Sequence, residues 1–161
     1  MDLSSMLTAE RVRADVTVSN WQEAVRAVGE LLVSSGGVED RYVEAMIETV
    51  RELGPYIVIA PGIALPHAAP DAGVIEPSLA LITLNPPVEF GNPDNDPVSL
   101  VIAFASPDKS THMQALRELA MILSDAGNRQ RLKSARTEAE ILGVMCSIPS
   151  AQEKAENGEG G

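Results

Sequence analysis

Two histidines are the residues of this chain best able to do chemistry, and the first lies in a proline-rich segment. His67 stands in the run 60–70, which reads APGIALPHAAP and follows a short apolar run. Pro61 and Pro66 fix their own φ angles and disfavour helix in the residues before them, so we expect a loop that presents the imidazole on stiff backbone. Near neutral pH an imidazole is largely neutral and keeps a nucleophilic nitrogen. The alternative is a histidine that only forms structural hydrogen bonds.

The second histidine, His112, stands at the predicted start of a helix. Thr111 and Gln114 have the spacing of a capping box, and apolar residues then recur with helical spacing. This predicts Thr111 as the N-cap and His112 as the first helical residue. At that position backbone N–H groups favour an anion, and the helix dipole disfavours protonation of the ring. We therefore predict that an anion such as a phosphoryl group is held between His67 and His112.

Several segments around these histidines match the pattern of a known family. The stretch 53–68 reads LGPYIVIAPGIALPHA, Thr111 and His112 follow downstream, and the segments 71–74, 87–92 and 95–98 read DAGV, PVEFGN and NDPV. Together they resemble the enzyme IIA (EIIA) proteins of the bacterial sugar phosphotransferase system, of the mannitol/fructose type (type 2), and most closely the ascorbate branch. The resemblance covers about residues 1–148, which predicts one EIIA domain there.

The resemblance implies a phosphotransferase that relays a phosphoryl group and uses no cofactor or metal. It implies that His67 takes the group from the small carrier protein phospho-HPr, and that His112 is the second active-site histidine. The group then passes to a cysteine of an EIIB component, which works with a membrane EIIC permease in sugar uptake. The sugar would be ascorbate-like or mannitol/fructose-like. In the family pattern a backbone carbonyl bonds Nδ1–H of the first histidine and leaves Nε2 as the nucleophile.

Three further positions are compared with the family pattern. Arg51 lies sixteen positions before His67, where mannitol-type relatives carry an arginine, so it is a candidate cation for the phosphoryl group. Its alternative is an exposed charge on a helix. Ala69 stands where many ascorbate-type relatives carry arginine, and Pro61 stands where the mannitol branch has a glutamate. These two departures remove a phosphate or partner contact and a carboxylate from the expected site.

Two other functions stay open at this point. The first is a regulatory EIIA-like protein, which controls a partner through its phosphorylation state without serving transport. The second is a metal-assisted hydrolase that uses His67, His112 and a carboxylate such as Asp108. Two histidines without an acid at motif spacing make a poor metal site, which disfavours the hydrolase.

Composition fits a single domain in the cytoplasm. The chain has 161 residues, 45% of them apolar, and a formal charge of −11 from 12 basic and 23 acidic residues. This charge argues against nucleic acid or an anionic membrane as the main partner and favours a basic protein. The chain shows no signal peptide and no apolar run near the ~20 residues that span a bilayer, so we expect no membrane insertion. Its one cysteine, Cys146, is interpreted as a buried structural thiol.

The elements that must position the histidines alternate between strands and helices. Runs of strand length lie at 11–18, 56–59, 79–84 and 98–105, and a proline- and asparagine-rich connection lies at 85–97. Helical patterns lie between a cap at Ser19 or Asn20 and Gly36, and at 40–53, 111–124, 129–134 and 137–147. This order predicts an α/β fold, with a single mixed β-sheet flanked by helices on both faces.

Two expectations concern the surface. The polar, glycine-ended segment 149–161 has no large apolar residue, so we expect a disordered tail. Ile63, Leu65 and Ala68 flank the histidine that both partners must reach, so we expect them to form one patch that HPr and EIIB contact in turn. The competing interpretation is that Ile63 and Leu65 point into the core.

Overall fold

A five-stranded mixed β-sheet forms the centre of the molecule. The computed structural model describes residues 6–147, with side-chain surroundings for 6–145. The strands lie in the order β1-β4-β5-β3-β2. Their bounds are Val12–Val16 for β1, Val58–Ala60 for β2, Ile63–Ala64 for β3, Ser78–Val88 for β4 and Val98–Ala105 for β5. β1 runs parallel to β4 and β3 parallel to β5, whereas the pairs β4–β5 and β2–β3 are antiparallel.

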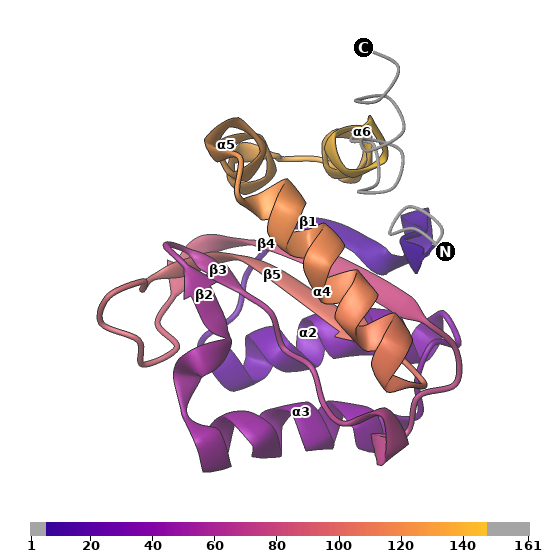
Figure 1. Cartoon of the computed structure of the whole chain (residues 1–161). Helices are drawn as coiled ribbons and strands as arrows, with labels where there is room; N and C mark the ends of the chain where they lie inside the picture. The colour runs from indigo at the N-terminus through magenta and orange to yellow at the C-terminus, as the bar shows by residue number, and fades with distance from the viewer. Residues whose placement is uncertain (1–5, 148–161) are drawn as a thin grey trace.

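Helices cover both faces of this sheet, which confirms the predicted fold class (Figure 1). One face carries α2 (Trp21–Ser34) and α3 (Asp40–Leu53), and the other carries α4 (Lys109–Leu123), α5 (Ala126–Ser134) and α6 (Glu138–Ser147). Alternate side chains of β5 enter the two cores: Val101 and Ala103 face α2 and α3, whereas Leu100, Ile102 and Phe104 face the other layer. A strand buried on both faces reads as one continuous apolar run.

The helices α2 and α3 follow the sequence prediction. Asn20 caps α2, because its side chain accepts a hydrogen bond from the backbone N–H of Glu23 at 2.9 Å. The bounds of α3 are those predicted, and Gly54, at φ 85°, ends this helix in a conformation that favours glycine. Helix α3 therefore ends, as expected, directly before the segment that leads to His67.

The strand predictions were partly wrong on either side of the histidine loop. Residues Pro55–Ile57 form a 3-10 turn instead of the start of a strand, and β2 begins only at Val58. β4 continues through the predicted connection as far as Val88, which pairs with Val98. Pro86 lies in this extension where the register shifts between Thr83 and Val88, so no regular ladder bond is required of its missing N–H.

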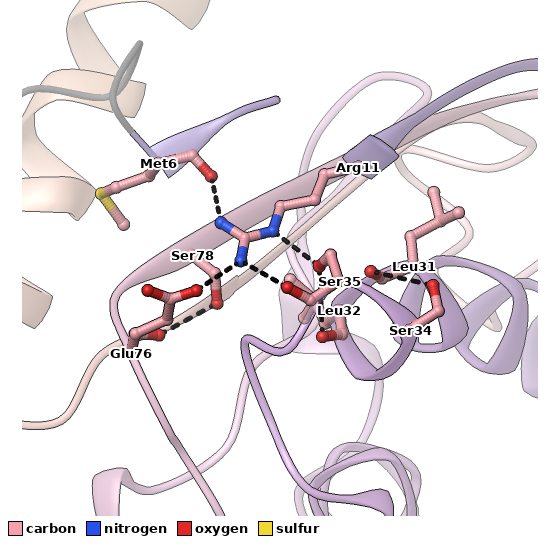
Figure 2. A network of polar contacts seen from close by, with 8 residues as sticks. All are labelled: Met6, Arg11, Leu31, Leu32, Ser34, Ser35, Glu76 and Ser78. Atoms are coloured by element: carbon pink, nitrogen blue, oxygen red, sulfur yellow. Dashed lines mark hydrogen bonds and ion pairs between the residues drawn. The ribbon is translucent and has the colours of Figure 1, made fainter. Parts of the chain in front are cut away.

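A buried arginine joins three distant segments near the start of β1. Figure 2 shows the guanidinium of Arg11 between Met6, Ser35 and Glu76. It donates to the carbonyl of Met6 at 2.9 Å, to Oγ of Ser35 at 2.7 Å and to a carboxylate oxygen of Glu76 at 3.0 Å. Only 5% of Arg11 is exposed, so these bonds replace the water that the charge has lost.

Three expectations concern residues at or beyond the ends of the range 6–147. The 149–161 tail lies outside the described residues, and the 1–148 domain boundary stays a prediction. Cys146 belongs to α6, but its side chain lies outside the described part, so its predicted burial is not tested. Within residues 6–147, no helix is both long and apolar enough to cross a membrane.

Candidate active site

The loop that carries His67 is held on its amino-terminal side by main-chain hydrogen bonds. The N–H of Leu65 donates to the carbonyl of Ile57 at 2.9 Å, and the N–H of Phe104 donates to the carbonyl of Pro66 at 3.4 Å. The loop is thus bonded to the 3-10 turn before β2 and to the end of β5. Both bonds fix the backbone immediately before the imidazole, as the prolines led us to expect.

One ring nitrogen of His67 is occupied within the loop. Nδ1 lies 2.8 Å from the carbonyl oxygen of Leu65. A carbonyl oxygen can only accept, so Nδ1 carries the proton of the neutral ring and Nε2 keeps its lone pair. The ring is half-buried. This geometry gives His67 a nucleophilic Nε2 and agrees with the arrangement that the resemblance implies.

The two predicted histidines meet over a single buried aromatic ring. The ring centroids of His67 and His112 are 5.5 Å apart. The ring of Phe104 is fully buried; it stacks on His67 at 4.9 Å and 27°, and it contacts His112 at 4.9 Å and 52°. The end of β5 therefore supports both imidazoles. His67 and His112 are 45 residues apart in the sequence, and they converge as predicted.

The helix that carries His112 begins earlier than predicted. Asp108, not Thr111, is the N-cap, and its Oδ1 accepts the N–H of Thr111 at 2.8 Å. His112 is therefore the fourth helical residue, and its own N–H donates to the carbonyl of Asp108 at 3.1 Å. Aspartate caps at least as well as threonine, and the earlier start adds most of a helical turn. The backbone N–H of His112 is consequently not available to an anion.

The electrostatics of His112 favour a neutral ring. Burial lowers the pKa of His112 below its ordinary value of 6.5, and repulsion from His67 in its protonated form lowers it further. The direction is the one predicted, but the causes are desolvation and the neighbouring histidine rather than the helix dipole. A neutral His112 offers one N–H donor and one acceptor nitrogen beside His67.

A pocket of about 480 Å³ opens over the two histidines. Its lining is mostly apolar and comprises Thr49, Tyr56, His67, Ala68, Ala69, Pro70, Lys109, His112 and Met113. In the part of the chain that the structure describes, Lys109 is the only lysine or arginine in this lining. Lys109 was not among the residues predicted from the sequence, although its position three residues before His112 was a signal. Once Asp108 is the N-cap, Lys109 becomes the first residue of the helix that carries His112.

Arg51, the cation predicted from the sequence, does not line this pocket. It lies in the last turn of α3, its side chain is 55% exposed, and its nearest guanidinium nitrogen is 3.7 Å from a carboxylate oxygen of Glu48. The structure thus brings His67 and His112 together and places Arg51 outside their pocket. Thr49, two residues earlier in α3, does reach the pocket.

The predicted partner patch was wrong in its residues. Ile63 is 0% exposed, Leu65 is 4% exposed and Ala68 is 6% exposed, because β3 and the loop after it pack inside the molecule. The competing interpretation, in which Ile63 and Leu65 point into the core, is confirmed. Two large apolar side chains of the pocket lining face solvent instead: Tyr56 is 50% exposed and Met113 is 51% exposed.

The asparagine-rich segment before β5 supports the backbone that leads to the histidine loop. The carboxylate of Asp96 accepts the N–H groups of Phe90, Gly91 and Asn92, each at 2.9 Å, and so closes this segment on itself. The amide of Asn95 then donates to the carbonyl of Val58 at 3.1 Å. The motif at 87–98 therefore bonds to the backbone of β2, which leads to the His67 loop.

The geometry does not favour a metal centre. Asp108 is engaged as a helix cap, and its hydrogen bonds with Thr111 lower the pKa of its carboxyl group. Across residues 6–147, no three histidine, cysteine, aspartate or glutamate side chains gather closely enough to hold a metal ion. The hydrolase alternative has no support from this arrangement.

A mixed sheet between two helical layers thus brings a loop histidine and a helix histidine to one pocket. Residues 5–147 match the family model described as phosphoenolpyruvate-dependent sugar phosphotransferase system, EIIA 2, and the chain belongs to this family. It is therefore a phosphocarrier of a sugar phosphotransferase system, of the class that carries phosphohistidine and transfers the phosphoryl group.

One curated relative and two solved structures show what this chain is similar to. The ascorbate-specific PTS system EIIA component of Escherichia coli K12 is 39% identical over 142 residues, which are 88% of this chain and 92% of the relative. The enzyme IIA of a complex of IIA-mannitol with phosphorylated IIB-mannitol from Escherichia coli is 28% identical with a TM-score of 0.77, covering 88% of this chain and 98% of its own. The nitrogen regulatory protein IIA-Ntr of Neisseria meningitidis is 26% identical with a TM-score of 0.75, covering 88% and 97%.

Proposed function

We propose that His67 is the residue that carries the phosphoryl group in this protein. The observation that carries the proposal is the hydrogen bond of Nδ1 to Leu65, because it leaves Nε2 unprotonated on a half-buried ring that lines the pocket. The lone pair of Nε2 attacks the phosphorus of the phosphohistidine of HPr. A new N–P bond forms, the N–P bond of the donor breaks, and the ring of HPr recovers the electron pair.

The second half of the relay passes the group to an EIIB component. The thiolate of a cysteine on EIIB attacks the phosphorus, an S–P bond forms, and the bond to Nε2 of His67 breaks. The solved complex of a related IIA with phosphorylated IIB supports an EIIB partner for this chain. Through EIIB the group reaches the sugar at an EIIC permease. We assign the relay to the cytoplasm, which fits a chain with a single cysteine.

Transfer between these groups depends on position and on the stabilisation of charge. The negative charge of the transferring phosphoryl group is spread over its non-bridging oxygens, so fixed donors and cations aimed at them lower the barrier. His112 lies 5.5 Å from His67, centroid to centroid, and its neutral ring can donate one N–H to such an oxygen. His112 is thus proposed to stabilise the group rather than to carry it.

Lys109 is our proposed cation for the same oxygens. It lines the pocket with both histidines, whereas Ala69 in that lining offers no charge in place of the arginine of many ascorbate-type relatives. Arg51 retains the role predicted from the sequence only if its guanidinium exchanges Glu48 for the phosphoryl group. An exposed ion pair of this kind contributes about 0–1 kcal/mol, so loss of the pair with Glu48 would cost little free energy.

The surface around the pocket is proposed to receive HPr and EIIB in turn. Tyr56 and Met113 expose about half of their surface beside the histidines and give the patch an apolar centre. A relay must release each partner after transfer, so we expect a small interface with micromolar or weaker affinity. An ascorbate-like sugar is favoured by the relative at 39% identity.

The neighbour IIA-Ntr favours one second candidate, a regulatory protein whose phosphorylation state controls a partner. The two candidates share the first transfer and differ in the second. A cognate EIIB that takes up the group from the phosphorylated protein identifies transport. If the protein is phosphorylated but no EIIB cysteine accepts the group, the regulatory function is correct.

The central experiment incubates the protein with phospho-HPr and follows intact mass. We expect one acid-labile phosphoryl group, mapped to His67 in the peptide digest, and none in His67→Ala. His112→Ala is the matched control, because it removes the other imidazole and should still become phosphorylated. Phosphorylation of His67→Ala at the wild-type level would contradict the proposal.

A further inference from the structure

A tyrosine from the opposite helical layer reaches the back of the histidine loop. Tyr42 lies in the first turn of α3 and is 0% exposed, and its hydroxyl bonds to backbone groups of the His67 loop and of β5. It accepts the N–H of Ala68 at 3.0 Å and donates to the carbonyl of Phe104 at 2.8 Å. The carbonyl of Ala68 lies farther from it, at 3.3 Å. One hydroxyl thus joins the residue after His67 to the strand residue beneath both imidazoles.

We propose that the hydroxyl of Tyr42 is a positioning group for phosphoryl transfer: it fixes the His67 loop relative to Phe104 and hence to His112. This inference rests on the proposed role of His67. Tyr42 contacts neither reacting atoms nor partner, so it acts through the backbone alone.

In the described residues, different groups support the loop before and after His67. Before His67, main-chain bonds hold Leu65 and Pro66. After His67, the hydrogen bonds of the Ala68 backbone that the described residues provide go to Tyr42. The tyrosine hydroxyl therefore holds the backbone after the imidazole, as the main-chain bonds hold it before.

The burial of the hydroxyl also points to this role. A phenyl ring would fill the same apolar core, whereas a buried hydroxyl is tolerated only when it is hydrogen-bonded. Burial raises the pKa of Tyr42 to about 12, so the hydroxyl keeps its proton throughout the pH range of the relay. The same group therefore donates and accepts at every relevant pH.

Tyr42→Phe tests the proposal, because it deletes one oxygen and keeps the ring. Thr83→Val is a matched control: Oγ1 of Thr83 is also buried, and it also accepts a backbone N–H, that of Asp15 at 2.8 Å. Thr83 pairs with Leu100 of β5, four residues before Phe104, and does not line the His67 pocket. Both variants lose stability, but only Tyr42→Phe loosens the loop.

The first readout is single-turnover transfer from the phosphorylated protein to EIIB. We expect Tyr42→Phe to slow transfer at saturating EIIB by about 10-fold or more, since misplacement of reacting groups by about 1 Å costs up to 100-fold. The EIIB concentration that gives half the maximal rate stays unchanged, and Thr83→Val transfers at the wild-type rate. Transfer by Tyr42→Phe at the wild-type rate, or an equal loss in Thr83→Val, would overturn the proposal.

The second readout needs no partner and separates this proposal from the proposed function. The chain has two histidines, so ring ¹⁵N and ¹H NMR signals can be assigned by His112→Gln. We expect Tyr42→Phe, but not Thr83→Val, to shift the His67 ring signals. Shifted signals with no phosphorylation of wild-type His67 would refute the relay alone, whereas unchanged signals would refute the positioning role.

A backbone change covers the case in which Tyr42→Phe does not fold. Replacement of Ala68 by L-lactic acid converts its N–H to an ester oxygen and leaves Tyr42 in the core. We expect the same slowing and the same shift of the His67 signals. Wild-type values for both would overturn the proposal.

Discussion

Nδ1 of His67 and the carbonyl oxygen of Leu65 are 2.8 Å apart, within one loop and two residues from each other. The bond belongs to the backbone of the loop itself, so no side-chain substitution removes the acceptor. It fixes the tautomer of the free protein and, in the proposed relay, leaves Nε2 as the nitrogen that reacts.

We predict that ¹⁵N NMR will show the Nδ1–H tautomer for His67 in the free protein and Nε2-phosphohistidine after the reaction with HPr. The reason is that the carbonyl of Leu65 can pair only with a protonated Nδ1. A phosphoryl group on Nδ1, or a free protein with its proton on Nε2, would show that the loop rearranges before it reacts.

His112→Ala is predicted to be phosphorylated and to pass the group to EIIB about 100-fold more slowly, because one positioned donor is lost. Rapid-quench measurement of the phosphorylated protein gives the rate. His112→Gln retains an N–H donor and should recover part of it. If His112→Ala relays as fast as the wild type, His112 is only a residue of the first helical turns.

Lys109→Met and Arg51→Met are predicted to differ. Lys109 lines the pocket, so its loss should slow transfer by about 10-fold or more, whereas Arg51 is paired with Glu48 outside the pocket and its loss should cost less. Arg136→Met, an exposed change of the same charge, measures the effect of net charge alone. The reverse order of Lys109→Met and Arg51→Met would assign the cation to Arg51.

The pH dependence of stability should carry a contribution from His112. Its pKa is lowered in the folded protein, so below its ordinary value of 6.5 the unfolded chain binds a proton that the folded chain resists. The free energy of unfolding therefore falls as the pH drops through this value, and His112 contributes nothing above it. Urea denaturation of wild type and His112→Gln at about pH 7.5 and about pH 5.5 tests this. The wild type should lose more stability than the variant; equal losses would contradict it.

Arg11→Met should lower the free energy of unfolding by about 2–3 kcal/mol, since it removes charge-assisted bonds to Met6 and Ser35 from a buried position. Glu76→Gln should cost only about 0–1 kcal/mol, because the side chain of Glu76 is 55% exposed. Denaturant titration measures both. An equal cost for the two variants would mean that the ion pair with Glu76, not the bonds to Met6 and Ser35, holds this junction.

Local signals in the sequence were sufficient for much of this fold. The prolines around His67 predicted its loop, Gly54 marked the end of α3, and the apolar run at 98–105 gave both ends of β5. In each case the signal acts on the backbone of its own residues, so no distant contact had to be known.

Competition between similar signals caused the error at α4. Asp108 and Thr111 both have a residue type that caps helices, and the capping box at Thr111 was the more complete pattern. The structure uses Asp108, and the carboxylate binds the N–H of Thr111. Propensity alone does not decide between two caps three residues apart.

Other features depend on contacts between distant segments. Arg11 reads as a polar residue at the start of a strand, yet it is buried because Ser35 and Glu76 lie beside it. Tyr42 belongs to the apolar stripe of α3, and nothing local distinguishes its hydroxyl from a solvated one. Ile63 and Leu65 were placed at the surface because of their proximity to His67, whereas proximity in sequence says nothing about direction.

Because Phe104 contacts both imidazoles, the effect of a substitution depends on whether it moves both rings or only one. A substitution at position 104 acts on both histidines at once, because both imidazoles contact the ring of Phe104. A substitution in the loop or in α4 displaces one histidine against the other. We therefore expect this protein to tolerate substitutions that act on both histidines better than substitutions that move only one of them.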